Sequence, residues 1–160
     1  MRKCIRSPLF YVGDKYKILN QILPHFPNKI NSFIEPFVGG GSVFLNVEAT
    51  KYNLNDFEYH LINLHKFLNK NNYKKLLNTI ERNIIKYGLS KSYIEDIIPD
   101  RLKKKFVKTY YAKFNKDAYI DMRTDFNKNH TSYVLLYLLV IYGFNRMLRF
   151  NSKGNYNVPV

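Results

Sequence analysis

The sequence is poor in the residues that build covalent cross-links and metal centres. Its one cysteine, Cys4, cannot form an internal disulfide, and no group of cysteines and histidines has the spacing of a zinc site. The apolar run 133–144 is shorter than the ~18–20 residues of a membrane-spanning helix, and the basic N-terminus lacks the apolar core and cleavage site of a signal peptide. We therefore expect a cytoplasmic protein without a disulfide, a metal site or a membrane anchor.

Acidic residues are also scarce. The 160 residues include 12 Asp and Glu against 26 Lys and Arg, which gives a net charge of +14. Such an excess favours a polyanionic partner, of which nucleic acid is the commonest. The alternative is a compositional bias, because AT-rich codons enrich Lys, Asn, Ile and Tyr without any function. With 46% hydrophobic and 16% aromatic residues, the chain has enough apolar material for a folded core.

The first part of the chain has the alternating pattern of an α/β fold. Short apolar runs bounded by turn residues predict strands, and apolar residues three and four apart predict amphipathic helices. The expected elements are strands over 31–39 and 51–57 and helices over 16–26, from Ser42 onward and over 59–69.

The second part of the chain is polar, basic and helical in its pattern. A helix is expected over 73–87, with its end at Gly88. The run of lysines at 103–105 indicates a solvated helix face, and the apolar run 133–144 indicates a buried helix. Turn residues at 152–154 then predict a reversal of the C-terminal tail.

A glycine-rich loop follows the first expected strand. Gly39, Gly40 and Gly41 permit positive φ and a close approach of a ligand to the backbone. The third glycine of G-x-G-x-x-G is missing and there is no G-x-x-x-x-G-K-[ST], so a dinucleotide fold and a phosphate-loop ATPase are disfavoured. Glu35 precedes the loop, and Asp56 ends the next strand, where a carboxylate suits ribose hydroxyls. This pattern favours S-adenosylmethionine, and an unrelated nucleotide-binding enzyme is the alternative.

Three segments in order, 8–27, 33–46 and 142–159, resemble motifs of the Dam-type (D12 class) DNA adenine-N6 methyltransferases. The second, "FIEPFVGGGSVFLN", is similar to the family's E-P-F-x-G-x-G motif almost letter for letter. The resemblance implies an incomplete Rossmann-like S-adenosylmethionine-dependent methyltransferase fold with a mainly helical DNA-recognition subdomain. It assigns the cofactor part to 1–67 and the target-recognition region to 68–160.

The resemblance also implies a cofactor site. Tyr11 matches an aromatic residue, usually tryptophan, that lies near the adenine ring, and Lys15 matches the lysine at the carboxylate end of the cofactor. Asp14 replaces the second glycine of that motif and is expected to pair with Lys15. Asp56 is expected to hold the ribose, to cap the helix over 59–69, or both. The cofactor-binding residues implied are Tyr11, Gly13, Lys15, Glu35, Phe37, Gly39, Gly41 and Asp56.

The third segment implies contacts to double-stranded DNA, with GATC as the expected target. Arg149 is the residue expected to read a guanine through O6 and N7, and Asn145 is a further hydrogen-bonding candidate. Phe144 and Met147 are expected to act as apolar wedges where the duplex opens, with core packing as the alternative. Pro159 resembles the family's contact at the end of this hairpin.

The family's catalytic motif, [DN]-P-P-[YFW], is absent because no two of the six prolines are adjacent. The resemblance therefore predicts an N-terminal portion of a site-specific methyltransferase of the restriction-modification kind, inactive alone and without catalytic residues of its own. A second chain carrying the motif would then complete a split enzyme. The alternatives are a non-catalytic DNA-binding remnant and an unrelated nucleotide-binding enzyme, and the order of the three motifs disfavours the last.

Overall fold

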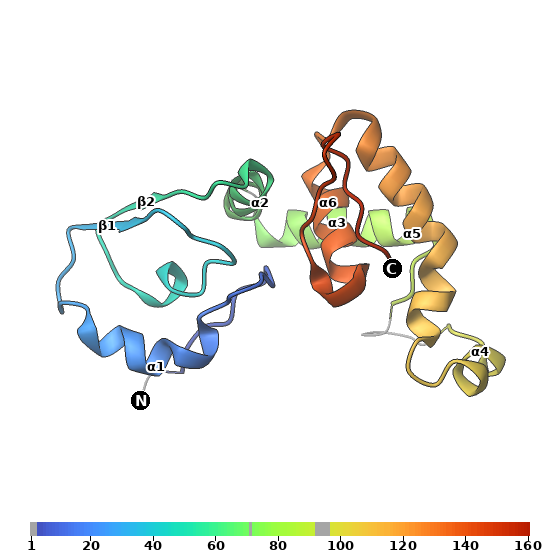
Figure 1. The fold of residues 1–160 in the computed structure, drawn as a ribbon, viewed down its shortest axis with the longest axis horizontal. Coiled ribbons are helices and arrows are strands. Elements are labelled where there is room, and N and C mark those ends of the chain that lie inside the picture. Colours follow the sequence, from blue (N-terminus) through green and yellow to red (C-terminus); the bar gives the residue numbers. More distant parts are fainter. Residues whose placement is uncertain (1–2, 71, 92–96) are drawn as a thin grey trace. The chain divides into compact units, whose positions relative to one another are not determined.

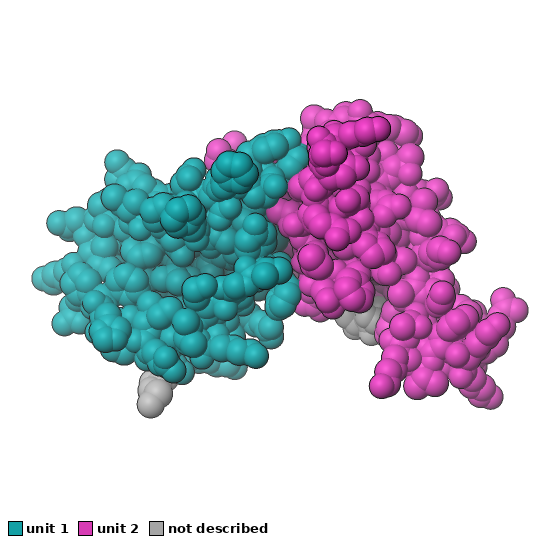
Figure 2. Space-filling view, in the orientation of Figure 1, with its two compact units in different colours: residues 1–63 teal, residues 64–160 magenta. Residues whose placement is uncertain are grey.

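The computed structural model describes residues 3–70, 72–91 and 97–160 (Figure 1). The chain forms two compact units, Met1–Asn63 and Leu64–Val160 (Figure 2). Within the described ranges, no helix combines the length and the apolar character needed to cross a membrane. The fold class is mixed, with a small parallel sheet in the first unit and helices in the second.

Two parallel strands organise the first unit. Strand β1 spans Ser32–Glu35 and pairs with β2, Lys51–Leu54, so that Ser32 lies opposite Lys51 and Glu35 opposite Leu54. Both strands lie within the predicted segments, which confirms the prediction. Parallel strands require a crossover, and residues 36–50 provide it, including the glycine loop.

The helix expected from Ser42 is reduced to one 3-10 turn, η3, over Phe44–Asn46. The cause is the side chain of Asn46. Its Nδ2 donates to the carbonyl oxygen of Ser42 at 2.8 Å, which is the acceptor that the Asn46 amide would use in an α-helix. The amide of Asn46 bonds Val43 instead, at 2.9 Å. The prediction of a longer helix here was wrong.

The helix expected over 16–26 is broken into three short pieces: η1 over Tyr16–Ile18, α1 over Leu19–Ile22 and η2 over Leu23–His25. Pro24 explains the break before the last piece because proline has no N–H for a helical bond to the fourth residue before it. Leu19 is fully buried, whereas Ile18 is 39% exposed, so the apolar face is narrower than the spacing predicted.

Helix α2 spans Tyr59–Lys70, close to its predicted range, and the boundary between the two units falls within it. In the second unit, α3 spans Tyr73–Tyr87 and ends at Gly88, whose φ of 70° is the left-handed conformation expected of a C-terminal glycine. The lysine-rich segment forms α4, Asp100–Lys105, and α5, Tyr110–Asn129.

Helix α6, Tyr133–Tyr142, forms the core of the second unit. Leu136 and Leu139 are fully buried against neighbouring helices, which confirms the buried helix predicted from the apolar run. A 3-10 turn, η4, Phe144–Arg146, follows. The tail then reverses at 151–154 and closes with an antiparallel bridge between Phe150 and Tyr156, so the predicted turn is confirmed (Figure 1).

Candidate functional site

A pocket of about 530 Å³ lies in the first unit, where the carboxyl ends of β1 and β2 meet the glycine loop. Four stretches of chain line it: residues 11–15, the side chains of Ile22 and Phe26, the glycine loop with its preceding strand, and Asp56 after β2. The lining includes every residue that the sequence predicted for a cofactor: Tyr11, Gly13, Lys15, Glu35, Phe37, Gly39, Gly41 and Asp56.

The three consecutive glycines meet different requirements. Gly39 and Gly41 have φ values of +50° and +86°, which side chains other than glycine rarely adopt. Gly40 is required for space, because a Cβ there would lie 2.5 Å from the carbonyl oxygen of Leu9. The Ser7 hydroxyl donates to the carbonyl oxygen of Gly40 on the same side. The loop is thus closed against the N-terminal segment, which brings Tyr11 to the pocket.

Asp56 ties the end of β2 to the glycine loop. Its Oδ2 accepts a hydrogen bond from the amide of Gly39 at 2.9 Å, and its Oδ1 accepts one from the amide of Glu58 at 3.1 Å. The second bond closes the turn that leads into α2. A carboxylate offers several lone pairs on each oxygen, so Asp56 keeps acceptor capacity toward the pocket.

Tyr11 packs its ring over the glycine loop. A Cβ at Gly39 would lie 3.3 Å from the Tyr11 ring, so the loop leaves room for a flat aromatic face. Burial raises the pKa of the Tyr11 phenol, and the nearby carboxylates of Asp56 and Glu58 raise it further. The phenol therefore stays neutral at physiological pH and borders the same space as Asp56.

The expected pairing of Asp14 with Lys15 is wrong. Asp14 Oδ1 accepts from the Tyr16 amide at 3.0 Å and from the Ser42 hydroxyl. It therefore closes a turn just before the 3-10 turn η1 and fastens this segment to the glycine loop. Lys15 instead donates from Nζ to the carbonyl oxygen of Gly13 at 2.6 Å, and its ammonium remains exposed in the pocket.

Glu35 presents an unused acceptor. Its Oε2 is buried and has no hydrogen-bond partner in the described part of the chain, while the amide of Phe44 hydrogen bonds the carboxyl group. Burial raises the pKa of Glu35 to about 7, and the Phe44 hydrogen bond opposes this shift. Phe37, two residues further on, is 83% exposed and forms an apolar edge of the pocket. The pocket thus combines an acceptor for a donor group with an exposed aromatic edge.

The predicted DNA-contact residues gather on the tail of the second unit. Phe144 is 55% exposed, so core packing is wrong for this residue, and its amide donates to the carbonyl oxygen of Pro159 at 2.7 Å. Asn145 is exposed with φ of 51°. Met147 is half-buried, so its burial does not decide between an apolar wedge and core packing. Pro159 is thereby joined to the start of the recognition hairpin, which we define as residues 144–159.

Arg149 lies across the recognition hairpin from Asn157. Its Nε donates to Asn157 Oδ1 at 2.9 Å, and its Nη2 donates to the Asn157 carbonyl oxygen at 3.2 Å. The side chain is exposed. Its other N–H groups have no partner among the described residues, so a pair of donors on the outer edge is held in a fixed orientation.

Helix α5 holds the recognition hairpin through side chains spaced four residues apart. Tyr119 donates to the Val158 carbonyl oxygen at 3.1 Å, and Arg123 donates to the same oxygen at 3.0 Å. Asn127 makes two bonds to Tyr156, donating to its carbonyl oxygen and accepting from its amide. The sequence analysis missed these residues, although polar groups every fourth position on a helix beside an apolar run were a readable signal.

Gly143 lets α6 approach this support closely. A Cβ there would lie 2.5 Å from the Leu139 carbonyl oxygen and 2.8 Å from the Tyr119 hydroxyl. The Tyr156 hydroxyl donates to the carbonyl oxygen of Met147 at 2.8 Å, which joins the two arms of the recognition hairpin. Burial raises the pKa of Tyr119 to about 12, so its phenol remains a donor at physiological pH.

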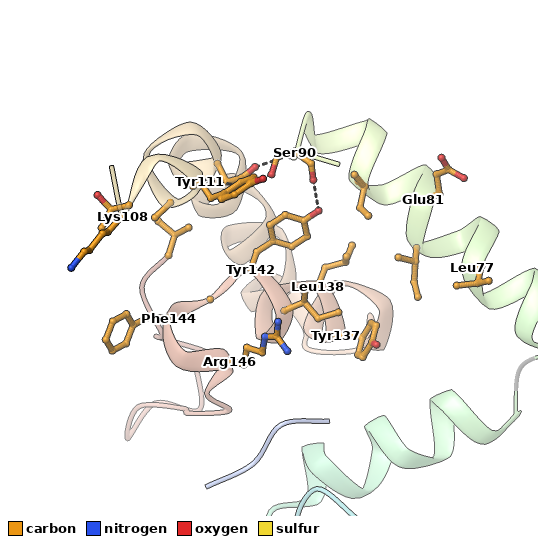
Figure 3. Close-up of a pocket in the computed structure, with 18 residues that line it drawn as sticks. Leu77, Glu81, Ser90, Lys108, Tyr111, Tyr137, Leu138, Tyr142, Phe144 and Arg146 are labelled. Atoms are coloured by element: carbon orange, nitrogen blue, oxygen red, sulfur yellow. Dashed lines mark hydrogen bonds between the residues drawn. The ribbon is translucent and has the colours of Figure 1, made fainter. Parts of the chain in front are cut away.

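A second pocket, of about 890 Å³, lies among α3, α5 and α6 in the second unit (Figure 3). Tyr142 donates to the Ser90 carbonyl oxygen at 2.7 Å at one side of it, as the dashed line shows. Phe144 and Arg146 of the recognition hairpin line the pocket too. The lining is mostly apolar, and no sequence motif predicted it.

Charge is distributed unevenly between the units. Residues 64–160 contain 19 of the 26 Lys and Arg but only seven of the 12 Asp and Glu, so the second unit carries +12 of the net +14. Compositional bias alone would spread lysine over both units. The segregation therefore favours a polyanion that binds the unit with the recognition hairpin.

Comparison with known proteins agrees with these features. The chain is 35% identical over 158 residues to the modification methylase StsI of Streptococcus sanguinis and 37% identical over 155 residues to the type II methyltransferase M.FokI of Planomicrobium okeanokoites. These matches cover 99% and 97% of this chain but only 21% and 20% of those proteins. A DNA adenine methylase of Haemophilus influenzae is 35% identical over 160 residues, covering 96% of this chain and 46% of that protein.

The chain thus spans about a fifth to a half of the length of these relatives. Residues 11–160 match the sequence model of one protein family. The match includes the pocket residues from Tyr11 to Asp56 and the entire recognition hairpin. The chain belongs to the D12 class N6 adenine-specific DNA methyltransferase family.

Proposed function

We propose that this chain provides the S-adenosylmethionine pocket and the DNA-recognition hairpin of a site-specific DNA adenine-N6 methyltransferase. One observation carries the proposal: all eight residues predicted for the cofactor, from three separated stretches of sequence, line a single pocket. Family membership supports the same assignment. The strands β1 and β2 would be part of a Rossmann-like sheet, with the ligand at their carboxyl ends.

The chemistry of the pocket fits S-adenosylmethionine, which supplies an electrophilic methyl group when bound. Asp56 has acceptor capacity left for ribose hydroxyls after its bonds to Gly39 and Glu58. The flat ring of Tyr11 provides a surface for the adenine. The Oε2 of Glu35 is suited to accept a hydrogen bond from the ammonium group of the cofactor. The exposed ammonium of Lys15 is suited to bind the carboxylate end of the cofactor. Exposed Phe37 would be covered by the ligand.

The recognition hairpin fits double-stranded DNA. The outward N–H groups of Arg149 suit the O6 and N7 atoms of guanine, and we propose GATC as the target sequence. We propose that Phe144, whose ring is exposed, stacks where a base leaves the helix. Asn145, with its exposed side chain, would bond a base edge or a phosphate. The charge of +12 on this unit would supply the attraction that does not depend on sequence.

The methyl acceptor requires a further group. Adenine must leave the duplex, and hydrogen-bond acceptors must align its amino group. The [DN]-P-P-[YFW] motif supplies these acceptors in the family. The 160 residues contain no such motif. We therefore propose that methyl transfer takes place only when a polypeptide carrying this motif completes the site. The alternative is a DNA-binding protein without catalysis, which the folded recognition hairpin and the charge of the second unit favour.

The test measures two ligands on the same chain. We expect tritiated S-adenosylmethionine to be retained by the protein, and a duplex with one GATC site to be bound in preference to a scrambled duplex. Binding of DNA without the cofactor would support the non-catalytic alternative instead. Binding of neither ligand would contradict both. Mixing in a polypeptide with the D-P-P-Y motif should then transfer label to the GATC duplex, and a continued lack of transfer would refute the split enzyme.

A further inference from the structure

Helix α4 and the first turns of α5 carry the densest group of cations in the chain. Between positions 100 and 116 there are seven Lys and Arg and one carboxylate, Asp100. Six of these cations have exposed side chains, and we call them the α4–α5 basic surface: Arg101, Lys104, Lys105, Lys108, Lys113 and Lys116. The two helices pack against each other at one end of the second unit (yellow in Figure 1).

These cations are largely unneutralised within the described part of the chain. Asp100 is 3.5 Å from Lys103, which is outside the basic surface. Elsewhere in the unit, Lys91 pairs with Glu81 at 3.0 Å and Lys128 pairs with Asp125 at 2.6 Å. By contrast, none of the six cations of the basic surface has a carboxylate partner among the described residues. Their charge is therefore available to an external anion.

One aromatic ring holds two of the cations close together. Phe106 follows α4, and its ring centre lies 5.5 Å from Lys105 Nζ and 5.2 Å from Lys113 Nζ. The two ammonium groups come from different helices and lie within about 11 Å of each other. A purely solvated helix face would let two like charges separate. Here both lie over one ring and stay exposed, so two positive charges from different helices share one small surface.

The basic surface is distant from the hairpin contact along α5. Lys113 lies in the first turns of this helix, whereas Asn127, which holds the recognition hairpin, lies near its end. Fourteen residues of α-helix span roughly 20 Å, which corresponds to about six base pairs at 3.4 Å each. The surface is therefore placed for DNA that flanks the sequence read by the hairpin.

We propose that the α4–α5 basic surface binds the phosphate backbone of duplex DNA, with Lys105 and Lys113 as two contacts that carry no sequence information. The Phe106 ring positions both ammonium groups, and the flexible neighbours Lys104, Lys108 and Arg101 add to the local potential. The inference rests on the proposed function only in taking duplex DNA as the partner. It assigns part of the affinity to a surface outside the recognition hairpin.

The experiment is a salt titration of DNA binding by the full 160-residue chain. Each neutralised phosphate contributes about 0.9 to the slope of log K against log salt, so K105Q/K113Q should reduce the slope by about 1.8. At 0.1 M salt this corresponds to roughly 60-fold weaker binding, equally on GATC and scrambled duplexes. K105R/K113R, which keeps both charges, should retain the wild-type slope.

The matched control is K74Q/K86Q. Lys74 and Lys86 also lie over aromatic rings, at 6.0 Å from Tyr73 and 4.9 Å from Tyr87, but on α3. This control removes the same charge and the same kind of ring contact. Because both lysines lie on α3, outside the basic surface, the salt slope of K74Q/K86Q should stay within a few tenths of the wild-type slope. Equal losses in both double variants, or no loss in K105Q/K113Q, would overturn the inference while leaving the cofactor pocket and hairpin assignments intact. Absence of any DNA binding by wild type would overturn it too, whereas cofactor retention would be judged separately.

Discussion

Asn127 is the residue through which α5 most directly fixes the recognition hairpin. Its side-chain amide donates to the Tyr156 carbonyl oxygen at 3.0 Å and accepts from the Tyr156 amide at 2.9 Å. Tyr156 is only 1% exposed. Replacing Asn127 with alanine would leave both backbone groups unpaired in a buried position, at about 1–3 kcal/mol for each group. We expect the hairpin to lose roughly 2–6 kcal/mol of local stability.

Hydrogen exchange at the Tyr156 amide measures this effect locally. Because about 1.4 kcal/mol corresponds to a factor of ten, exchange should accelerate roughly 30- to 20,000-fold in Asn127→Ala. The control is Asn78→Ala, an exposed asparagine on α3 whose side chain has no hydrogen bond among the described residues. Preference for GATC over a scrambled duplex should fall in the first variant and not in the second. Exchange and preference that match the control would refute the role of α5 as the hairpin support.

Three further predictions concern the pocket and base readout. Gly40→Ala should weaken S-adenosylmethionine binding at least tenfold in calorimetry, because its Cβ would meet the Leu9 carbonyl oxygen at 2.5 Å; unchanged affinity would show that the loop is not closed on Leu9. The pKa of Glu35 is raised to about 7, so the folded state keeps a proton that the unfolded state has lost, and stability should fall as pH rises from about 4.5 to 7. Thermal unfolding of Glu35→Gln should lack this component, and identical pH profiles would contradict it. Arg149→Ala should reduce the GATC preference more than total affinity, whereas equal losses on all duplexes would identify a phosphate contact.

Local patterns were sufficient to predict the two strands and the glycine loop of the pocket. An apolar run that ends in glycines, with a carboxylate after the next strand, defined β1, the loop and Asp56 in the correct relation. The turn at 152–154 and the end of α3 at Gly88 followed from residue types that favour one backbone conformation. These features depend on a few neighbouring residues, so periodicity and turn chemistry capture them.

Apart from the helix over 16–26, which Pro24 breaks locally, the failures involve partners distant in sequence or competing side chains. The charge of Asp14 suggested an ion pair with its neighbour Lys15. Instead, the carboxylate accepts a hydrogen bond from the hydroxyl of Ser42, 28 positions away. The apolar spacing after Ser42 indicated a helix, but Asn46 took the acceptor that the helix needed. The support of the recognition hairpin by α5 arises only when segments about 30 positions apart meet.

Calorimetry of S-adenosylmethionine with wild type and Asp56→Ala measures whether residues 11–15, the glycine loop and Asp56 form one cofactor pocket. Asp56 both bonds the Gly39 amide at 2.9 Å and faces the pocket. Its loss should therefore weaken binding by about 2–3 kcal/mol, roughly 30- to 150-fold, through loss of hydrogen bonds to a charged group. Asp100→Ala, an exposed carboxylate on α4, should bind as wild type does. Wild-type affinity in Asp56→Ala, or heat of binding in neither protein, would contradict the account.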